Sequence, residues 1–279
     1  YWSNAFSGVI NVMTVEAEDS PSELKVTLGS FGTYAVEGVT SAELTESASV
    51  VAAGKRSGSA GWGYRAFDFV GVEQQIDYES DDYSVTLNGQ WRNFEVSYYE
   101  SRTKDAVMDS SPAFPRWPAT EYYKLHRFVD VGYLHPLNDS WSLQANFTYN
   151  RQNREVYNGA VDVDGENTLT ELVLLGDLNE NTHLIAGLNY QDFDGVDFNG
   201  TPDPTHFRFN WKAAYVQLDH RLADWAKVVL GSQYNDDSTE QQLSSRAGLI
   251  LNWSERWGAK ILWAEAFRSP YAAELFLAS

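Results

Sequence analysis

The side chains best suited to binding a small molecule lie in one proline-rich stretch, SSPAFPRWPATEYYK (110–124). Prolines stiffen such a segment, and an arginine among aromatic rings can hold a planar or anionic group. We predict a ligand-binding loop whose contacts are made by Phe114, Arg116, Trp117 and Tyr122. The alternative is that the rings pack within the loop or, for the two tyrosines, belong to an aromatic girdle.

Two acidic segments have residue types that could bind a divalent cation. In VDVDGEN (161–167), Asp162, Asp164 and Glu166 surround a glycine, but the spacing does not supply the Glu that an EF-hand needs at its twelfth position. The segment 192–203 is acidic and contains glycine and proline. We expect both to be solvated loops, with a weak calcium site as the alternative, and we predict no resident metal or cofactor.

Other candidate chemistry is weak. The glycine-rich residues 58–65 do not open a helix after a buried parallel strand, so they predict a mobile extracellular loop rather than a phosphate cradle. His206 falls in a long polar segment and is the one histidine that could meet a ligand. No catalytic arrangement can be assembled from the 39 acidic residues without arbitrary choice, and there is no cysteine, so an enzyme is not expected. A net charge of -19 argues against nucleic acid as a partner.

The elements that must position these side chains are β-strands with one apolar and one polar face. WSLQANFTYN (141–150) alternates strictly, which is typical of a strand. The apolar set is Trp141, Leu143, Ala145, Phe147 and Tyr149, and the polar set is Ser142, Gln144, Asn146, Thr148 and Asn150. The pattern recurs in 84–91, 183–193 and 246–253. The strands are longer than the five or six residues usual in soluble proteins and match the length that crosses a bilayer.

The connections between strands alternate in length. Short ones are PLNDSW (136–141), LNENTH (178–183), LADWAK (222–227) and WSERWG (253–258). Long polar ones are predicted at 103–122, 153–167, 194–210 and 236–242. Tryptophans beside the short turns fit an aromatic girdle, and this asymmetry is that of an outer-membrane barrel. The alternative is a soluble β-sandwich with decorated loops.

We count thirteen strands, whereas bacterial single-chain barrels have an even number. The expected ranges are 23–31, 33–43, 47–56, 82–91, 94–103, 123–136, 141–152, 168–178, 183–193, 211–222, 226–235, 243–253 and 257–266. The odd count and the start at Tyr1 rather than Met predict that this chain is a fragment of a longer protein, truncated at both ends.

Three segments, in order along the chain, resemble TonB-dependent outer-membrane receptors. YWSNAFSGVINVMT (1–14) is similar to the end of their plug domain and departs from it at Trp2, where the family usually has glycine. VTLGSFGTYAVEG (26–38) looks like their first barrel hairpin. WAEAFRSPYAAELF (263–276) resembles their phenylalanine-arginine-alanine-proline segment, with Ser269 in place of alanine.

The resemblance implies an all-β fold: residues 1–20 would end a plug domain, and 21–279 would form the first part of an antiparallel transmembrane barrel of the 22-stranded type. It implies a monomer in the outer membrane of a Gram-negative bacterium, surrounded by lipid and lipopolysaccharide. The family imports a scarce ligand with energy supplied by TonB, and we expect an iron complex (ferric siderophore or haem) or cobalamin. The alternatives are a passive porin-like or structural barrel and a soluble all-β adhesin or enzyme.

Overall fold

The computed structural model describes residues 17, 22–67, 71, 73–77, 79–107, 120–156, 161–197, 205–237 and 240–266, all of whose regular elements are strands. The predicted plug strand at the start of the chain lies outside them. The strands are β1 (Glu23–Leu28), β2 (Tyr34–Thr45), β3 (Ala48–Ser59), β4 (Gly63–Phe67), β5 (Glu73–Asp77), β6 (Ser80–Trp91), β7 (Phe94–Val107), β8 (Thr120–Asn138), β9 (Trp141–Val156), β10 (Val161–Asn179), β11 (Thr182–Asp197), β12 (Thr205–Ala223), β13 (Ala226–Asp236), β14 (Gln241–Leu251) and β15 (Ala259–Ala264).

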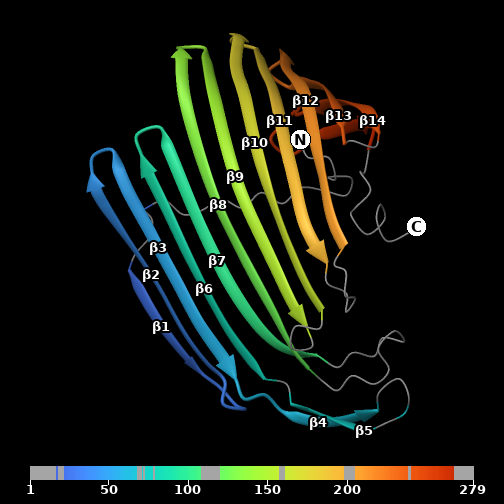
Figure 1. Cartoon of the computed structure of the whole chain (residues 1–279). Helices are drawn as coiled ribbons and strands as arrows, with labels where there is room; N and C mark the ends of the chain where they lie inside the picture. Colours follow the sequence, from blue (N-terminus) through green and yellow to red (C-terminus); the bar gives the residue numbers. More distant parts are fainter. Residues whose placement is uncertain are drawn as a thin grey trace.

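Thirteen of these strands form one antiparallel meander, in which each strand pairs with its neighbours along the chain (Figure 1). The predicted count of thirteen wall strands is therefore confirmed. The exception to the simple order is a separate hairpin, β4–β5, inserted between β3 and β6. The prediction of a loop over 58–65 was wrong in part, because Ser59 ends β3 and Gly63 begins β4. The glycines in 58–65 favoured a loop in the sequence analysis, although the residues on either side of them pair as strands.

Tight turns join successive strand pairs at one end of the sheet, the upper end in Figure 1. The Asn138 side chain accepts a hydrogen bond from the Ser140 N–H at 2.9 Å, and Asn179 does the same for the Asn181 N–H at 3.0 Å. This is the local turn chemistry expected of asparagine. The predicted turn after the first strand is also present, where Phe31 and Gly32 have φ of 58° and 65°.

Several strands extend further than the sequence suggested, at the end opposite the tight turns. β8, β10 and β12 each have 19 residues. The predicted long loops at 153–167 and 194–210 were wrong over most of their length, because β9 and β10 pair up to Val156 and Val161, and β11 and β12 up to Asp197 and Thr205. Polar composition suggested loops, but the backbones of these extensions pair in register, and charged side chains such as Asp164 and Arg208 form ion pairs between neighbouring strands.

The sheet curves (Figure 1), and burial differs between its faces. Leu169, Val173, Ala213 and Tyr215 are buried, and the register places them on one face of β10–β12. The alternate residues Leu188 and Val216, on the other face, are 59% and 44% exposed. Side chains crowd together on the inside of a curved sheet and spread apart on the outside, so the first face is the inner one. No helix in the described part of the chain has the length and apolarity to cross a membrane.

Candidate functional site

The outer face of the sheet is a band of apolar side chains. The register aligns Leu172, Leu188 and Ala214 across β10, β11 and β12. Near the tight turns, the Trp141 ring lies over Gly176, where an added Cβ would be only 2.3 Å from it. Exposed apolar residues in such numbers suit a hydrocarbon environment rather than water.

Beyond this band, towards the long connections, the outer face becomes charged. Arg151 pairs with Asp164 at 2.5 Å and Arg208 pairs with Asp192 at 2.9 Å. The hydrogen bond to Asp192 raises the pKa of the Arg208 guanidinium above its ordinary value. Paired charges above an apolar band place this part of the strands outside the hydrocarbon region.

The inner face carries amides, hydroxyls and carboxylates bonded to one another. Asp130 accepts hydrogen bonds from Asn146 Nδ2 at 3.0 Å and from Thr148 Oγ1 at 2.5 Å. The hydroxyl of Tyr215 on β12 reaches across β11 and donates to Glu171 on β10 at 3.0 Å. Such a face is able to contact water or a polar protein surface, and it is the candidate functional surface of the chain.

Two aromatic clusters interrupt this polar inner face. Tyr99, His126 and Phe128 form one on β7–β8, with 5.5 Å between the Tyr99 and Phe128 ring centroids. Phe193 of β11 and Trp211 and Phe209 of β12 form the second, with Phe193 centroids 4.6 Å from Phe209 and 4.7 Å from Trp211. The two clusters lie at the same level of the sheet, because one row of register partners runs through both. That row is Tyr99, Phe128, Asn150, Asn167, Phe193 and Phe209.

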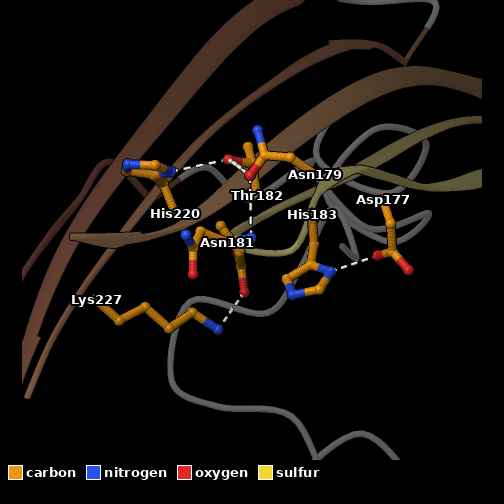
Figure 2. A network of polar contacts seen from close by, with 8 residues as sticks. Asp177, Asn179, Asn181, Thr182, His183, His220 and Lys227 are labelled. Carbon is orange, nitrogen blue, oxygen red and sulfur yellow. Dashed lines mark hydrogen bonds and ion pairs between the residues drawn. The ribbon is translucent and has the colours of Figure 1, made fainter. Parts of the chain in front are cut away.

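A network of polar contacts lies at the tight-turn end of β10–β13 (Figure 2). The Asn179 side chain accepts from Thr182 Oγ1 at 3.0 Å, and Thr182 contacts the His220 ring at 2.9 Å. His183 bonds to Asp177, and Lys227 pairs with Asp219 at 2.5 Å. Because these contacts link the four strands β10, β11, β12 and β13 next to their turns, we interpret them as fixing the turn end of the wall.

The predicted binding loop is only partly within the described residues. Phe114, Arg116 and Trp117 lie outside them, and the backbone of Tyr122 pairs with Asp105 and Val156 as part of β8. The neighbouring Tyr123 ring has the Arg102 guanidinium carbon 5.0 Å from its centroid. Arginine therefore does meet an aromatic ring at the base of this connection.

The acidic segment 161–167 is a strand and not the solvated loop that was predicted. Asp164 binds Arg151, Asp162 accepts from Asn153 Nδ2 at 2.8 Å, and Glu166 accepts from the Tyr149 hydroxyl at 2.7 Å. Each of these carboxylates has a hydrogen-bond donor on β9. The segment therefore forms side-chain contacts between two paired strands and not a loop around a cation. No cluster of three or more metal-ligating side chains occurs in the described ranges.

Two further predictions concern the 192–203 segment and His206. Residues 192–197 belong to β11, so the first half of that segment is strand; its remainder lies outside the described residues. His206 was expected in a long loop but lies in β12, opposite Val196. Sequence reasoning missed the aromatic cluster of β11–β12, although the alternation Phe207, Phe209, Trp211 in FRFNW carried the signal.

A long antiparallel meander with an apolar outer face, a polar inner face and tight turns at one end defines the wall of a transmembrane β-barrel. The family model for the TonB dependent receptor-like β-barrel matches residues 56–279. The chain therefore belongs to this family, which is one of receptors rather than enzymes. No curated protein matches it.

Solved structures with the same fold include siderophore receptors. A variant of the ferric enterobactin receptor PfeA from Pseudomonas aeruginosa has a TM-score of 0.65 at 12% identity, over 85% of this chain and 41% of that one. The siderophore receptor PirA from the same organism gives 0.62 at 15%, over 86% and 40%. BauA, the ferric preacinetobactin receptor from Acinetobacter baumannii, gives 0.57 at 12%, over 84% and 45%. The present chain thus spans less than half the length of these receptors.

Proposed function

We propose that this chain forms part of the wall of an outer-membrane receptor that imports an iron complex, with a ferric siderophore as the ligand class. The observation that carries the proposal is the two-faced sheet of a chain that belongs to the TonB dependent receptor-like family. The siderophore receptors among the similar structures support the choice of ligand over haem and cobalamin. Lipid and lipopolysaccharide would contact the outer apolar band and the charges above it.

In this proposal the wall stays fixed during import, and the part that moves would be a plug inside the barrel. Residues 1–20 would end that plug, and TonB would pull on a segment preceding this chain. Ligand and TonB must favour different plug states for binding to be coupled to import. The inner face suits this role because its amides and carboxylates, such as Asn146 and Asp130, can exchange plug contacts for water at little cost.

The experiment that tests the proposal is uptake by the bacterium that encodes the protein. Deleting the full-length gene should abolish import of one radiolabelled ferric complex under iron limitation, and removing TonB should have the same effect. Restoring the gene should restore import. Import that continues at an unchanged rate without TonB would instead establish a passive porin, and unchanged import after deletion of the gene would refute the proposed ligand class.

The loop 110–124 is proposed to contact the ligand through Arg116 and Trp117. Replacing either residue by alanine in the full-length receptor should weaken ligand binding by about tenfold, the cost of a charge-assisted or stacking contact. Arg92→Ala is the matched control, since Arg92 lies in the tight turn after β6, at the opposite end of the sheet. Equal affinity in all three variants would show that these side chains only pack within the loop.

A further inference from the structure

Arg102 of β7 is a candidate contact for a lipid headgroup. Strand alternation places it on the same face as Phe94 and Val96, two exposed residues of the outer apolar band. Arg102 is itself exposed, and within the described residues no carboxylate lies at ion-pair distance from it. Such an arginine is unexpected in a protein whose net charge is -19.

The carboxylate two residues before Arg102, that of Glu100, is already bound by other donors. Its Oε1 accepts a hydrogen bond from the Tyr83 hydroxyl at 2.7 Å. Its Oε2 accepts from the Tyr98 hydroxyl at 2.8 Å and from Arg127 Nε at 2.7 Å. Glu100 therefore balances the charge of Arg127, and the charge of Arg102 can be balanced by a partner outside the chain.

The Tyr123 ring of β8 fixes where the Arg102 side chain lies. The Arg102 guanidinium carbon is 5.0 Å from the ring centroid, and Lys104 Nζ is 6.0 Å from the same centroid. Lys104 also lies 3.9 Å from Glu79. Because a ring contacts the face of a guanidinium, the N–H donors in its plane stay available to an acceptor.

The position of Arg102 along β7 places it at the edge of the apolar band opposite the tight turns. Phe94, beside a tight turn, and Arg102 are separated by roughly 26 Å along the strand. At the strand tilt of about 40° usual in such barrels, this is roughly 20 Å across the membrane. Since the apolar band of these barrels is about 25 Å tall, the long Arg102 side chain can extend from its edge into the headgroup region.

The charge of the outer face is different further along the sheet, on β9–β12. Arg151 and Arg208 are each paired with an acidic residue there. Glu166 and Asp194 lie opposite each other in register on β10 and β11, both on the outer face. These carboxylates would repel an anionic headgroup, whereas the exposed charge of Arg102 on β7 would attract one.

We infer that Arg102, with Arg127 beside it, binds the phosphate group of a lipid in the outer leaflet, and that the lipid is the phosphorylated glycolipid part of lipopolysaccharide. A guanidinium can give a phosphate two parallel hydrogen bonds together with its charge. The acyl chains would lie against Val85, Leu87 and Val96, which are 38%, 43% and 43% exposed on the outer face of β6 and β7. The inference rests on the outer-membrane location in the proposed function and does not depend on which ligand is imported.

Three variants of the full-length receptor test the site. Arg102→Gln removes the charge, and Tyr123→Leu removes the ring that holds the guanidinium in place. The matched control is Arg208→Gln, because Arg208 is also on the outer face but is paired with Asp192 at 2.9 Å. Assembly of every variant is checked by the heat-dependent migration of a folded barrel in electrophoresis. If Tyr123→Leu does not assemble, Arg102→Gln decides the result.

Binding is measured by native mass spectrometry of the receptor in mild detergent, with diphosphorylated lipid A and chemically dephosphorylated lipid A as the probes. We expect Arg102→Gln to lower affinity for the phosphorylated probe by about five- to tenfold and Tyr123→Leu by about two- to fivefold. Affinity for the dephosphorylated probe should be the same in all variants, and Arg208→Gln should bind both probes as the unsubstituted receptor does. Millimolar inorganic phosphate should not displace the lipid.

The outcomes separate this site from the proposed function. Unchanged affinity of assembled Arg102→Gln for the phosphorylated probe overturns the site, and so does an equal loss in Arg208→Gln, which would mean that any outer-face arginine suffices. Displacement by inorganic phosphate overturns the lipid as the occupant. Because neither TonB nor an iron complex takes part in the assay, each of these results leaves iron uptake standing, and a receptor that imports no iron complex can still bind the lipid.

Discussion

At the scale of single residues, Leu188 shows how strongly the face of a strand determines the cost of a substitution. It lies on the outer face of β11 between Leu172 and Ala214 and is 59% exposed. We expect Leu188→Arg to oppose membrane assembly by about 2–4 kcal/mol, the cost of a lipid-facing arginine near the bilayer midplane. Denaturant titration of the receptor folded into lipid vesicles measures this loss.

Asn189 provides the control for that substitution, because it is the next residue and faces inward. Its neighbours in register are Glu171 and Ala213, so Asn189→Arg would place a cation beside a carboxylate. Its assembly should be close to that of the unsubstituted receptor. Comparable losses in the two variants would mean that the faces have been assigned wrongly.

Turn stability depends on one side chain at the end of β10. Asn179 accepts hydrogen bonds from the Asn181 N–H and from the Thr182 hydroxyl, both at 3.0 Å. Asn179→Ala should lower the free energy of unfolding by about 1 kcal/mol, since these donors would lose their protein partner. The measurement is a urea titration, with Asn181→Ala as the control because the turn uses only the backbone of that residue. Equal stability of both variants would contradict the role of Asn179.

Residue types indicated these turns but not the contacts of the acidic side chains. Asparagine before a two-residue connection is a local signal, so the turns at Asn138 and Asn179 could be predicted from the sequence. The partners of Asp164 and Glu166 could not, because Arg151 and Tyr149 lie on another strand and the register decides which donor each acid meets.

At the scale of strands, alternation predicted which elements exist better than where they end. Every predicted wall strand is present, because one apolar and one polar face give a clear two-residue period over the lipid-facing part. The pattern changes where β9–β12 leave the apolar band, since charged residues such as Asp164 and Arg208 lie on the outer face there while Phe193 and Phe209 lie on the inner one. Strand ends near Val161 and Thr205 depend on cross-strand pairing, which the local sequence does not reveal.

Some glycines of the strands lie beneath an aromatic ring of the neighbouring strand, and a side chain added there would displace the ring. Gly187 lies opposite Tyr215, and an added Cβ would be 2.3 Å from the tyrosine ring. Gly187→Ala should therefore displace a ring that is only 8% exposed and reduce stability by about 1–3 kcal/mol. Gly89→Ala, with nothing within 4 Å of the added Cβ, should change stability far less. Matched urea titrations compare the two, and equal losses would show that ring packing is not the cause.

At the scale of the whole molecule, the sheet has two edges and one strongly apolar face. Within the described residues, β1 pairs only with β2 and β15 only with β14. Each edge strand therefore presents backbone donors and acceptors to any neighbour, and the outer face presents apolar side chains such as Leu188 and Ile261, 59% and 63% exposed. In a complete barrel, further strands and lipid would cover these surfaces.

We therefore expect residues 22–266, produced by themselves, to require detergent and to associate through their edges. In a detergent phase-separation assay the segment should enter the detergent phase, because its exposed apolar face has no other apolar partner. Sedimentation in detergent should give oligomers, whereas the full-length receptor, with a closed sheet, should sediment as a monomer. A segment that stays in the aqueous phase as a monodisperse monomer would be incompatible with an outer face that contacts lipid, and it would favour the soluble β-sandwich considered at the outset.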